Sequence, residues 1–165
     1  MWQRVLSRRW LQADNGMDRP LRVLVESQSP VAAVADYWAF RLGRMDVAVC
    51  SGPGGDADEC PLVRGEPCPF AEQADAVLVE LDISLPSTQR IVAALTARHP
   101  DTSVVVEVAD GDTSLLPEGA VSLAKTASVN EQVRVLRRAA IDARRTGSLG
   151  APDLPGATSR RHTRD

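Results

Sequence analysis

The sequence is poor in aromatic and histidine side chains, and it carries no strong excess of charge of either sign. Phe, Trp and Tyr make up 4% of its 165 residues, two residues are histidine, and the net charge is −3. This charge excludes the broad positive surface that non-specific binding to nucleic acid or anionic lipid requires. No apolar run approaches the ~20 residues of a membrane span, and residues 1–20 make a poor signal peptide. We therefore expect a cytoplasmic domain that binds neither nucleic acid nor membranes.

The signature motifs of common enzyme classes are missing as well. The glycine-rich stretch GPGG at 52–55 lacks the Gly-Lys-Ser/Thr ending of a P-loop. We find no nucleophile elbow, no dinucleotide-binding fingerprint and no zinc-protease motif. One of the two histidines, His162, lies near the C-terminus. A chain without a motif that carries a catalytic mechanism is expected not to be an enzyme.

The chain divides into three parts by composition. Residues 1–20 form an N-terminal extension with apolar residues at helical spacing, Trp2, Val5, Leu6, Trp10 and Leu11. Residues 21–145 carry the regular pattern of one α/β domain, which is long enough to bury a core. Residues 146–165 are rich in Gly, Pro, Ser and Thr and end in basic residues. We expect this last part to be a disordered tail.

Strand-like and helix-like segments alternate through the domain. Apolar, β-branched runs predict strands over 21–26, 45–50, 74–83, 102–109 and 120–124. Helical spacing predicts helices over 31–42, 87–99 and 128–145, and the first of these places four large apolar residues on one face, Val31, Val34, Trp38 and Leu42. Two connections, 51–73 and 110–118, are too irregular for ordinary crossover helices. Such alternation predicts a mostly parallel sheet with helices on both faces and functional groups at the carboxyl ends of the strands.

Three segments of this layout resemble the response-regulator receiver domain of bacterial signal transduction. RVLVESQSP is similar to the opening receiver strand with its acidic pair, DAVLVELDI to the strand that delivers the phospho-accepting aspartate, and GAVSLAKTAS to the fifth strand with its lysine. The resemblance covers about residues 20–145. It implies a flavodoxin-like, CheY-like fold, with a five-stranded sheet of order 2-1-3-4-5 between two helical layers. It also implies a phosphorelay role, with a protein partner or a second copy bound through the fourth strand, the fifth strand and the last helix.

The resemblance also assigns a phosphorylation pocket, with departures from the family's pattern. The phospho-acceptor position falls on Glu80, with Asp82 as an alternative acceptor two residues later. The acidic pair falls on Glu26 and Ser27. Lys125 matches the receiver lysine. A glutamate at the acceptor position resembles a fixed mimic of the phosphorylated side chain more than a nucleophile.

Further departures in the same pocket affect the metal and the switch. Mg²⁺ needs clustered oxygen ligands, which Glu26 with Glu80 or Asp82 would have to supply. Val108 occupies the position of the switching hydroxyl, and Thr126 replaces the proline after the lysine. The resemblance therefore implies a degenerate receiver that acts through protein contacts without orthodox aspartate phosphorylation. The alternative is that these side chains are hydrophilic ends of strands.

The three cysteines raise a separate hypothesis. Cys50 ends the second predicted strand, and Cys60 and Cys68 lie in CPLVRGEPCPF, each followed by proline. Their spacing has no CxxC pair, so it is not a standard zinc pattern. A three-thiolate zinc site stays open, with a fourth ligand from among Asp56, Asp58, Glu59 and His99. An iron–sulfur cluster with an outside ligand, a disulfide, and a thiol made reactive by the nearby Arg64 stay open as well. The alternative to a redox or metal sensor is that the cysteines are small packing residues.

Overall fold

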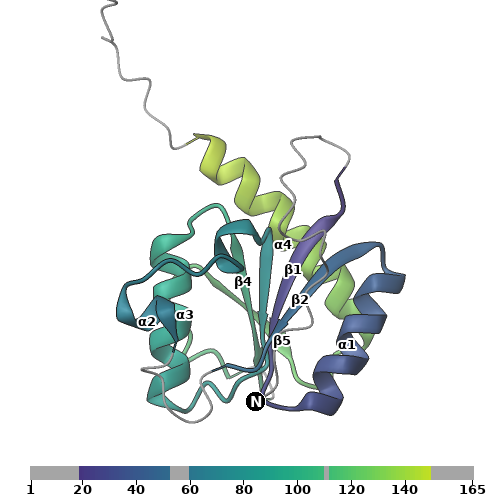
Figure 1. Cartoon of the computed structure of the whole chain (residues 1–165), viewed down its shortest axis with the longest axis horizontal. Coiled ribbons are helices and arrows are strands. Elements are labelled where there is room, and N and C mark those ends of the chain that lie inside the picture. Colours follow the sequence, from purple (N-terminus) through teal and green to yellow (C-terminus); the bar gives the residue numbers. More distant parts are fainter. Residues whose placement is uncertain (1–18, 53–59, 110–111, 150–165) are drawn as a thin grey trace, which may run out of the picture.

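The computed structural model describes residues 19–52, 60–109 and 112–149. They form a five-stranded sheet in the order β2-β1-β3-β4-β5, and each pair of neighbouring strands is parallel (Figure 1). The order confirms the predicted topology. The strands are β1 (Leu21–Glu26), β2 (Met45–Cys50), β3 (Ala76–Val79), β4 (Ser103–Val108) and β5 (Ala120–Ala124).

Helices cover both faces of this sheet. On one face, α2 (Pro61–Arg64) and α3 (Pro86–Arg98) pack against a core that includes Leu24, Val77 and Val104. On the other face, α1 (Pro30–Leu42) and α4 (Val129–Leu149) pack against Val23 and Leu78 (Figure 1). Alternate residues of each strand therefore enter two separate cores.

The predicted strand bounds agree with the structure for β1, β2 and β5, whereas β3 is shorter than expected. Its regular part covers only Ala76–Val79 of the predicted 74–83. Asp75 precedes it and Glu80 follows it, so a charged residue stands at each end of a fully buried strand. The apolar run is longer than the strand because Leu81 turns back into the core on the α2 and α3 side.

α1 begins and ends where the sequence predicts, but its large apolar residues face outward. Ser29 accepts a hydrogen bond from the backbone N–H of Ala32 at 3.2 Å, which makes it the N-cap before Pro30. The inward face consists of Ala33, Asp36 and Phe40. Val31, Val34, Trp38 and Leu42, which the helical spacing placed on one face, form the exposed face instead.

The two irregular connections are largely as predicted. The second crossover contains only the four-residue α2 and a single 3-10 turn, η2 (Ala71–Gln73), separated by a stretch with two prolines. Proline lacks a backbone N–H, which prevents a longer helix there. The described part of the link from β4 to β5, residues 112–119, consists of turns and coil. β5 consequently has little cover, and Leu123 is its one buried residue.

The ordered domain extends slightly beyond the limits expected from composition. Arg19, assigned to the N-terminal extension, forms two hydrogen bonds with the buried Asp75. α4 runs to Leu149, four residues past the expected end at 145. Residues 1–18 and 150–165 lie outside the described residues, as do most of the predicted extension and tail. Within the described ranges, no helix is long and apolar enough to cross a bilayer.

Candidate functional site

Charged residues meet at the carboxyl edge of the sheet, as predicted. Glu26 ends β1 beside Cys50 of β2, and the backbone N–H of Glu80 donates to the Glu26 carbonyl at 2.9 Å. Lys125 follows β5, and its N–H donates to the Val108 carbonyl at 3.0 Å. Since all five strands are parallel, these ends lie on one edge. Residues separated by up to 99 positions in the sequence therefore reach a common edge.

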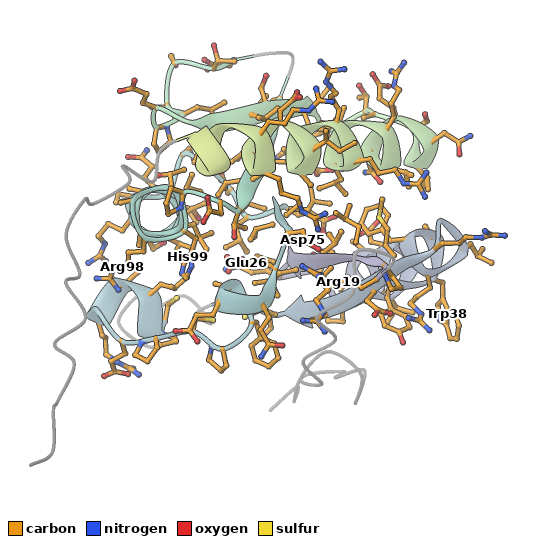
Figure 2. All side chains as sticks on the ribbon, turned by 90° about the horizontal axis from the view of Figure 1, so that it is seen from above. Arg19, Glu26, Trp38, Asp75, Arg98 and His99 are labelled. Carbon is orange, nitrogen blue, oxygen red and sulfur yellow. The ribbon has the colours of Figure 1, made fainter. Side chains whose placement is uncertain are left out.

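The two faces of the sheet, however, divide the predicted pocket. Glu26 has the same phase in β1 as Leu24, so it lies on the α2 and α3 side, where its charge acts on Cys50 and Cys60. Ser27 and Glu80 lie on the α1 and α4 side. Figure 2 shows Glu26 buried within the domain. Glu26 and Glu80 therefore lie on opposite faces of the sheet, which does not favour the metal-binding pocket that they were expected to share.

An open pocket of about 490 Å³ lies between α1, α4 and the carboxyl edge of the sheet. We call it the acidic pocket. Four carboxyl groups line it together with two serines, two glutamines and one lysine: Asp36, Glu80, Asp82, Glu107, Ser27, Ser29, Gln28, Gln132 and Lys125. Four of the five predicted site residues are among these, and Glu26 is the exception.

Glu80 occupies the centre of this arrangement electrostatically. Burial raises the pKa of its carboxyl group, the adjacent Asp36 carboxyl raises it further, and the Ser27 hydroxyl lowers it. The result is a pKa of about 8. Its Oε2 atom is buried without a hydrogen-bond partner. A carboxyl group with this pKa is mostly protonated at pH 7, which differs from the fixed negative charge that the sequence suggested.

Asp36, Glu107 and Gln132 are pocket residues that the sequence analysis missed. The Gln132 amide donates to Glu107 Oε1 at 3.2 Å, which joins α4 to β4. Burial and the Asp36 carboxyl raise the pKa of Glu107. Val108, the predicted switching position, is buried in the opposite core, so Glu107 is the β4 residue that faces the pocket. Asp36 and Glu107 could have been found from the sequence, because each is the one acidic residue in a mainly apolar helix or strand.

Asp82 and Lys125 form the outer rim of the acidic pocket. Both residues are exposed. Asp82 accepts a hydrogen bond from the Ser84 backbone N–H at 3.0 Å, and this contact, assisted by the charge of Lys125, lowers the pKa of its carboxyl group. Asp82 is therefore ionised at neutral pH and contributes a negative charge to the pocket. It lies past the end of β3 and lines the same pocket as Glu80.

The donor set does not fit the Mg²⁺ ion that the receiver resemblance implied. Magnesium prefers ionised carboxylates held close together. Here Glu26 lies on the other face of the sheet, and burial together with Asp36 raises the pKa of Glu80, which disfavours its ionised form. Within the part of the chain that the structure describes, no group of three His, Cys, Asp or Glu side chains is arranged to hold a metal ion. We derive no chemical step through a metal.

The three cysteines converge on the opposite face, beside Glu26. Each is half-buried, reduced and packed against the core under α2 and α3. Burial and the charge of Glu26 raise the pKa of Cys50 to about 12, and burial also raises the pKa of Cys60. Burial alone raises the pKa of Glu26 to about 7, and its Oε2 has no hydrogen-bond partner. Thiols in such surroundings are protonated and react slowly.

Of the four residues proposed as a fourth ligand for a cysteine metal site, His99 is the one that lies within the described residues. Asp56, Asp58 and Glu59 lie outside the described residues. His99 is the C-cap of α3. Burial lowers its pKa, the charge of Glu72 raises it, and the charge of Arg98 lowers it.

Comparison with known proteins identifies the fold. No model of a known protein family and no curated protein matches the chain. Among solved structures, a receiver-domain protein of Methanospirillum hungatei matches with a TM-score of 0.59 at 12% identity, over 78% of this chain and 99% of that one. The chain has a CheY-like receiver fold.

Two further structures agree with this assignment. A receiver-domain protein of Clostridium thermocellum matches with a TM-score of 0.56 at 18% identity, over 78% of this chain and 98% of the other. A pilus assembly protein of Burkholderia thailandensis matches with a TM-score of 0.58 at 16% identity, over 73% and 98% of the two chains. The receiver-like domain therefore accounts for about three quarters of this sequence, with strong divergence in its side chains.

Proposed function

We propose that this receiver-like domain is a non-enzymatic signalling or regulatory protein that acts through protein contacts without orthodox aspartate phosphorylation. The observation that carries the proposal is the acidic pocket, where burial and Asp36 raise the pKa of Glu80, the residue that the receiver resemblance assigns to the acceptor position. The fold alone supports a signalling role, since receiver folds serve signal transduction in the similar structures. The chemistry of the pocket supports the loss of phosphorylation.

Phosphoryl transfer to a carboxylate needs an ionised nucleophile and positive charge to neutralise the phosphoryl oxygens. Glu80 is mostly neutral at pH 7, because burial and Asp36 raise its pKa. Glu107 adds a third carboxyl group, and Lys125 is the single cation that lines the acidic pocket among the described residues. An incoming phosphate would therefore meet mainly carboxyl groups, which disfavours its binding.

The experiment is incubation of the full chain with acetyl phosphate and Mg²⁺, followed by intact mass measurement. We expect no stable adduct of about 80 Da, the mass of one phosphoryl group. Asp82→Asn is the decisive variant, because Asp82 is the exposed and ionised carboxylate of the pocket. An adduct on the natural sequence that disappears in Asp82→Asn would overturn the proposal and establish Asp82 as the acceptor.

For the contact surface we propose the face formed by β4, β5 and α4. A groove of about 660 Å³ runs between β5 and α4, and Val121 on its floor is 38% exposed. β5 is a short edge strand with unpaired backbone groups on one side, which is a surface that pairs readily with another chain. The partner is a signalling protein or a second copy of this chain. Light scattering at increasing concentration separates these two cases, and a Val121→Arg variant would weaken either contact.

A cysteine-based sensor is the second candidate, favoured by the convergence of Cys50, Cys60 and Cys68 next to Glu26. The raised pKa values of Cys50 and Cys60 oppose a reactive thiolate. Thiol counting and metal analysis of purified protein test it directly. Three unmodified thiols, no bound zinc or iron, and no change on mild oxidation would eliminate this function. A cytoplasmic location, which the sensor and the signalling role share, stays a prediction.

A further inference from the structure

α1 carries an apolar surface that the described residues leave uncovered. Its outer side chains are exposed to a degree unusual for large apolar groups: Val31 81%, Val34 55%, Trp38 63% and Leu42 85%. They are spaced at i, i+3, i+7 and i+11, so they form one continuous stripe along the helix. We call these four residues the α1 stripe. Figure 2 shows Trp38 directed away from the rest of the domain.

The opposite side of the same helix is apolar too. Ala33 and Phe40 are buried there on either side of Asp36, and Phe40 packs into the core that the sheet shares with α4, so α1 is apolar on most of its circumference. A helix of this kind belongs in an interior, with a second layer on its outer side. Contiguous exposed apolar surface on a small domain indicates a docking site. The α1 stripe therefore needs an occupant.

The chain itself supplies a segment of matching chemistry. Residues 1–18 contain five large apolar side chains at helical spacing, two of which are tryptophans: Trp2, Val5, Leu6, Trp10 and Leu11. The chain has three tryptophans, and Trp38 of the stripe is the third. Every tryptophan of the chain thus belongs either to the α1 stripe or to residues 1–18. The two buried cores of the domain contain no tryptophan among their described residues.

The attachment point of the segment favours this occupant. Arg19 is fixed by its two hydrogen bonds to Asp75, at 2.7 and 2.8 Å, immediately before β1. Leu21 of β1 pairs with Met45 of β2, and Met45 follows Leu42 by three residues. The segment therefore leaves the domain at the sheet edge where α1 ends. A helix of 18 residues spans about 27 Å, compared with about 20 Å for the 13 residues of α1.

We propose that residues 1–18 dock on the α1 stripe and cover it within the same molecule. A segment tethered so closely has an effective concentration of about millimolar, which favours intramolecular docking over capture of a second copy. In a helical segment, Arg4 and Arg8 would lie away from the Trp2 and Leu6 face, whereas Arg9 would lie on that face, where its aliphatic stem can pack while its guanidinium group reaches solvent. This proposal is independent of the phosphorylation chemistry, because the α1 stripe does not line the acidic pocket.

The test uses tryptophan fluorescence of the full chain. In a Trp2→Phe/Trp10→Phe background, Trp38 is the one tryptophan left, and Phe keeps the segment apolar. Adding Val5→Asp and Leu6→Asp should release the segment. We expect a red shift of Trp38 emission and a rise of roughly twofold in its acrylamide quenching constant, because the indole becomes exposed to water. Arg4→Asp in the same background is the control, and it should leave both values unchanged.

A reciprocal variant tests the same contact by changing the α1 stripe and observing residues 1–18. In a Trp2→Phe/Trp38→Phe chain, Trp10 reports on the segment, and Val34→Asp disrupts the stripe at a position already 55% exposed, so α1 can still fold. We expect the same red shift for Trp10. A fully solvent-exposed Trp38 that ignores Val5→Asp/Leu6→Asp overturns the proposal. So does a Trp38 signal that changes with protein concentration alongside dimer formation in light scattering, which would make a second copy the occupant.

Discussion

Buried carboxyl groups at the two edges of the sheet have pKa values shifted in opposite directions. At the amino edge, Asp75 accepts hydrogen bonds from the Arg19 and Arg144 guanidinium groups and from the Arg22 backbone N–H, at 2.6 to 2.8 Å. Burial would raise the pKa of Asp75, but these donors lower it below its usual range. At the carboxyl edge, Glu26 and Glu80 each have a buried oxygen without a hydrogen-bond partner, and both have raised pKa values.

This difference separates a structural edge from a functional one. Asp75 precedes β3 and links it to the start of β1 and to α4. Its charge is compensated by two arginines, and its role is structural. At the carboxyl edge, four carboxyl groups line the acidic pocket with Lys125 as the one cation among the described lining residues, and this excess of acidic groups costs stability. Costly electrostatics of this kind are typical of sites retained for function. Three predictions test the contrast.

The largest effect is expected from Asp75→Ala. It removes the shared acceptor of two arginines and leaves the Arg22 N–H without its side-chain partner. Breaking a buried, charge-assisted network typically costs about 3 kcal/mol, and partial exposure of the arginines keeps the loss near that value. Urea denaturation followed by circular dichroism measures it.

Glu66→Ala is the matched control for Asp75→Ala. Glu66 also pairs with an arginine, Arg64, but on the surface, with side chains 54% and 45% exposed. Solvent screens such a pair, so its loss should leave the free energy of unfolding unchanged within error. If the two variants lost similar stability, the amino edge would not be the structural edge that its contacts indicate.

The second prediction concerns the pH dependence of stability. Glu26 and Glu80 have folded pKa values of about 7 and about 8, above the value of 4.5 for an unperturbed glutamate. The folded state therefore keeps protons that the unfolded state releases, and stability falls as the pH rises from about 5 to about 8. Asp75 has a lowered pKa, so its contribution is present above about pH 4 and is lost as the pH falls further.

The stability profile should therefore have a maximum near pH 5, with one limb set by each edge. Glu26→Gln and Glu80→Gln should flatten the alkaline limb, each raising stability at pH 8 by about 1 to 2 kcal/mol after allowance for solvent screening. Asp75→Asn should flatten the acid limb instead. Denaturation midpoints from pH 3 to pH 9 measure both limbs. An alkaline limb unchanged by both glutamine variants would show that these carboxyl groups ionise normally.

The sequence was sufficient for the fold because each apolar run is bounded by turn or cap signals. The runs at 21–26, 45–50 and 120–124 became strands at those bounds, and their order placed Glu26, Glu80 and Lys125 on one edge. The sequence did not indicate which face each of these side chains occupies. Strands buried on both sides carry apolar residues at every position, so alternation gives no phase for the residue at the end.

The same ambiguity hid half of the acidic pocket. α1 is apolar on both sides, so its period did not reveal that Asp36 points inward while Trp38 points outward. Glu107 interrupts an apolar strand, and its phase was equally uncertain. The pocket depends on which of two apolar faces packs on α4, and that choice is made by tertiary contacts of Phe40 and Leu136 rather than by local pattern.

The smallest predicted effect is at Gln132, whose amide donates a hydrogen bond to Glu107 in the acidic pocket. It is 7% exposed, and its hydrogen bond to Glu107 lowers the pKa of that carboxyl group. Gln132→Met removes the donor and also the buried, unpaired Oε1 of Gln132, so the net cost should be only about 0.5 to 1 kcal/mol. The pKa of Glu107, followed by NMR of its carboxyl carbon, should rise. Arg138→Met changes an exposed residue of the same helix and should leave that pKa unchanged. A Glu107 that titrates identically in the Gln132→Met protein would mean that its ionisation is set by Asp36 and burial alone.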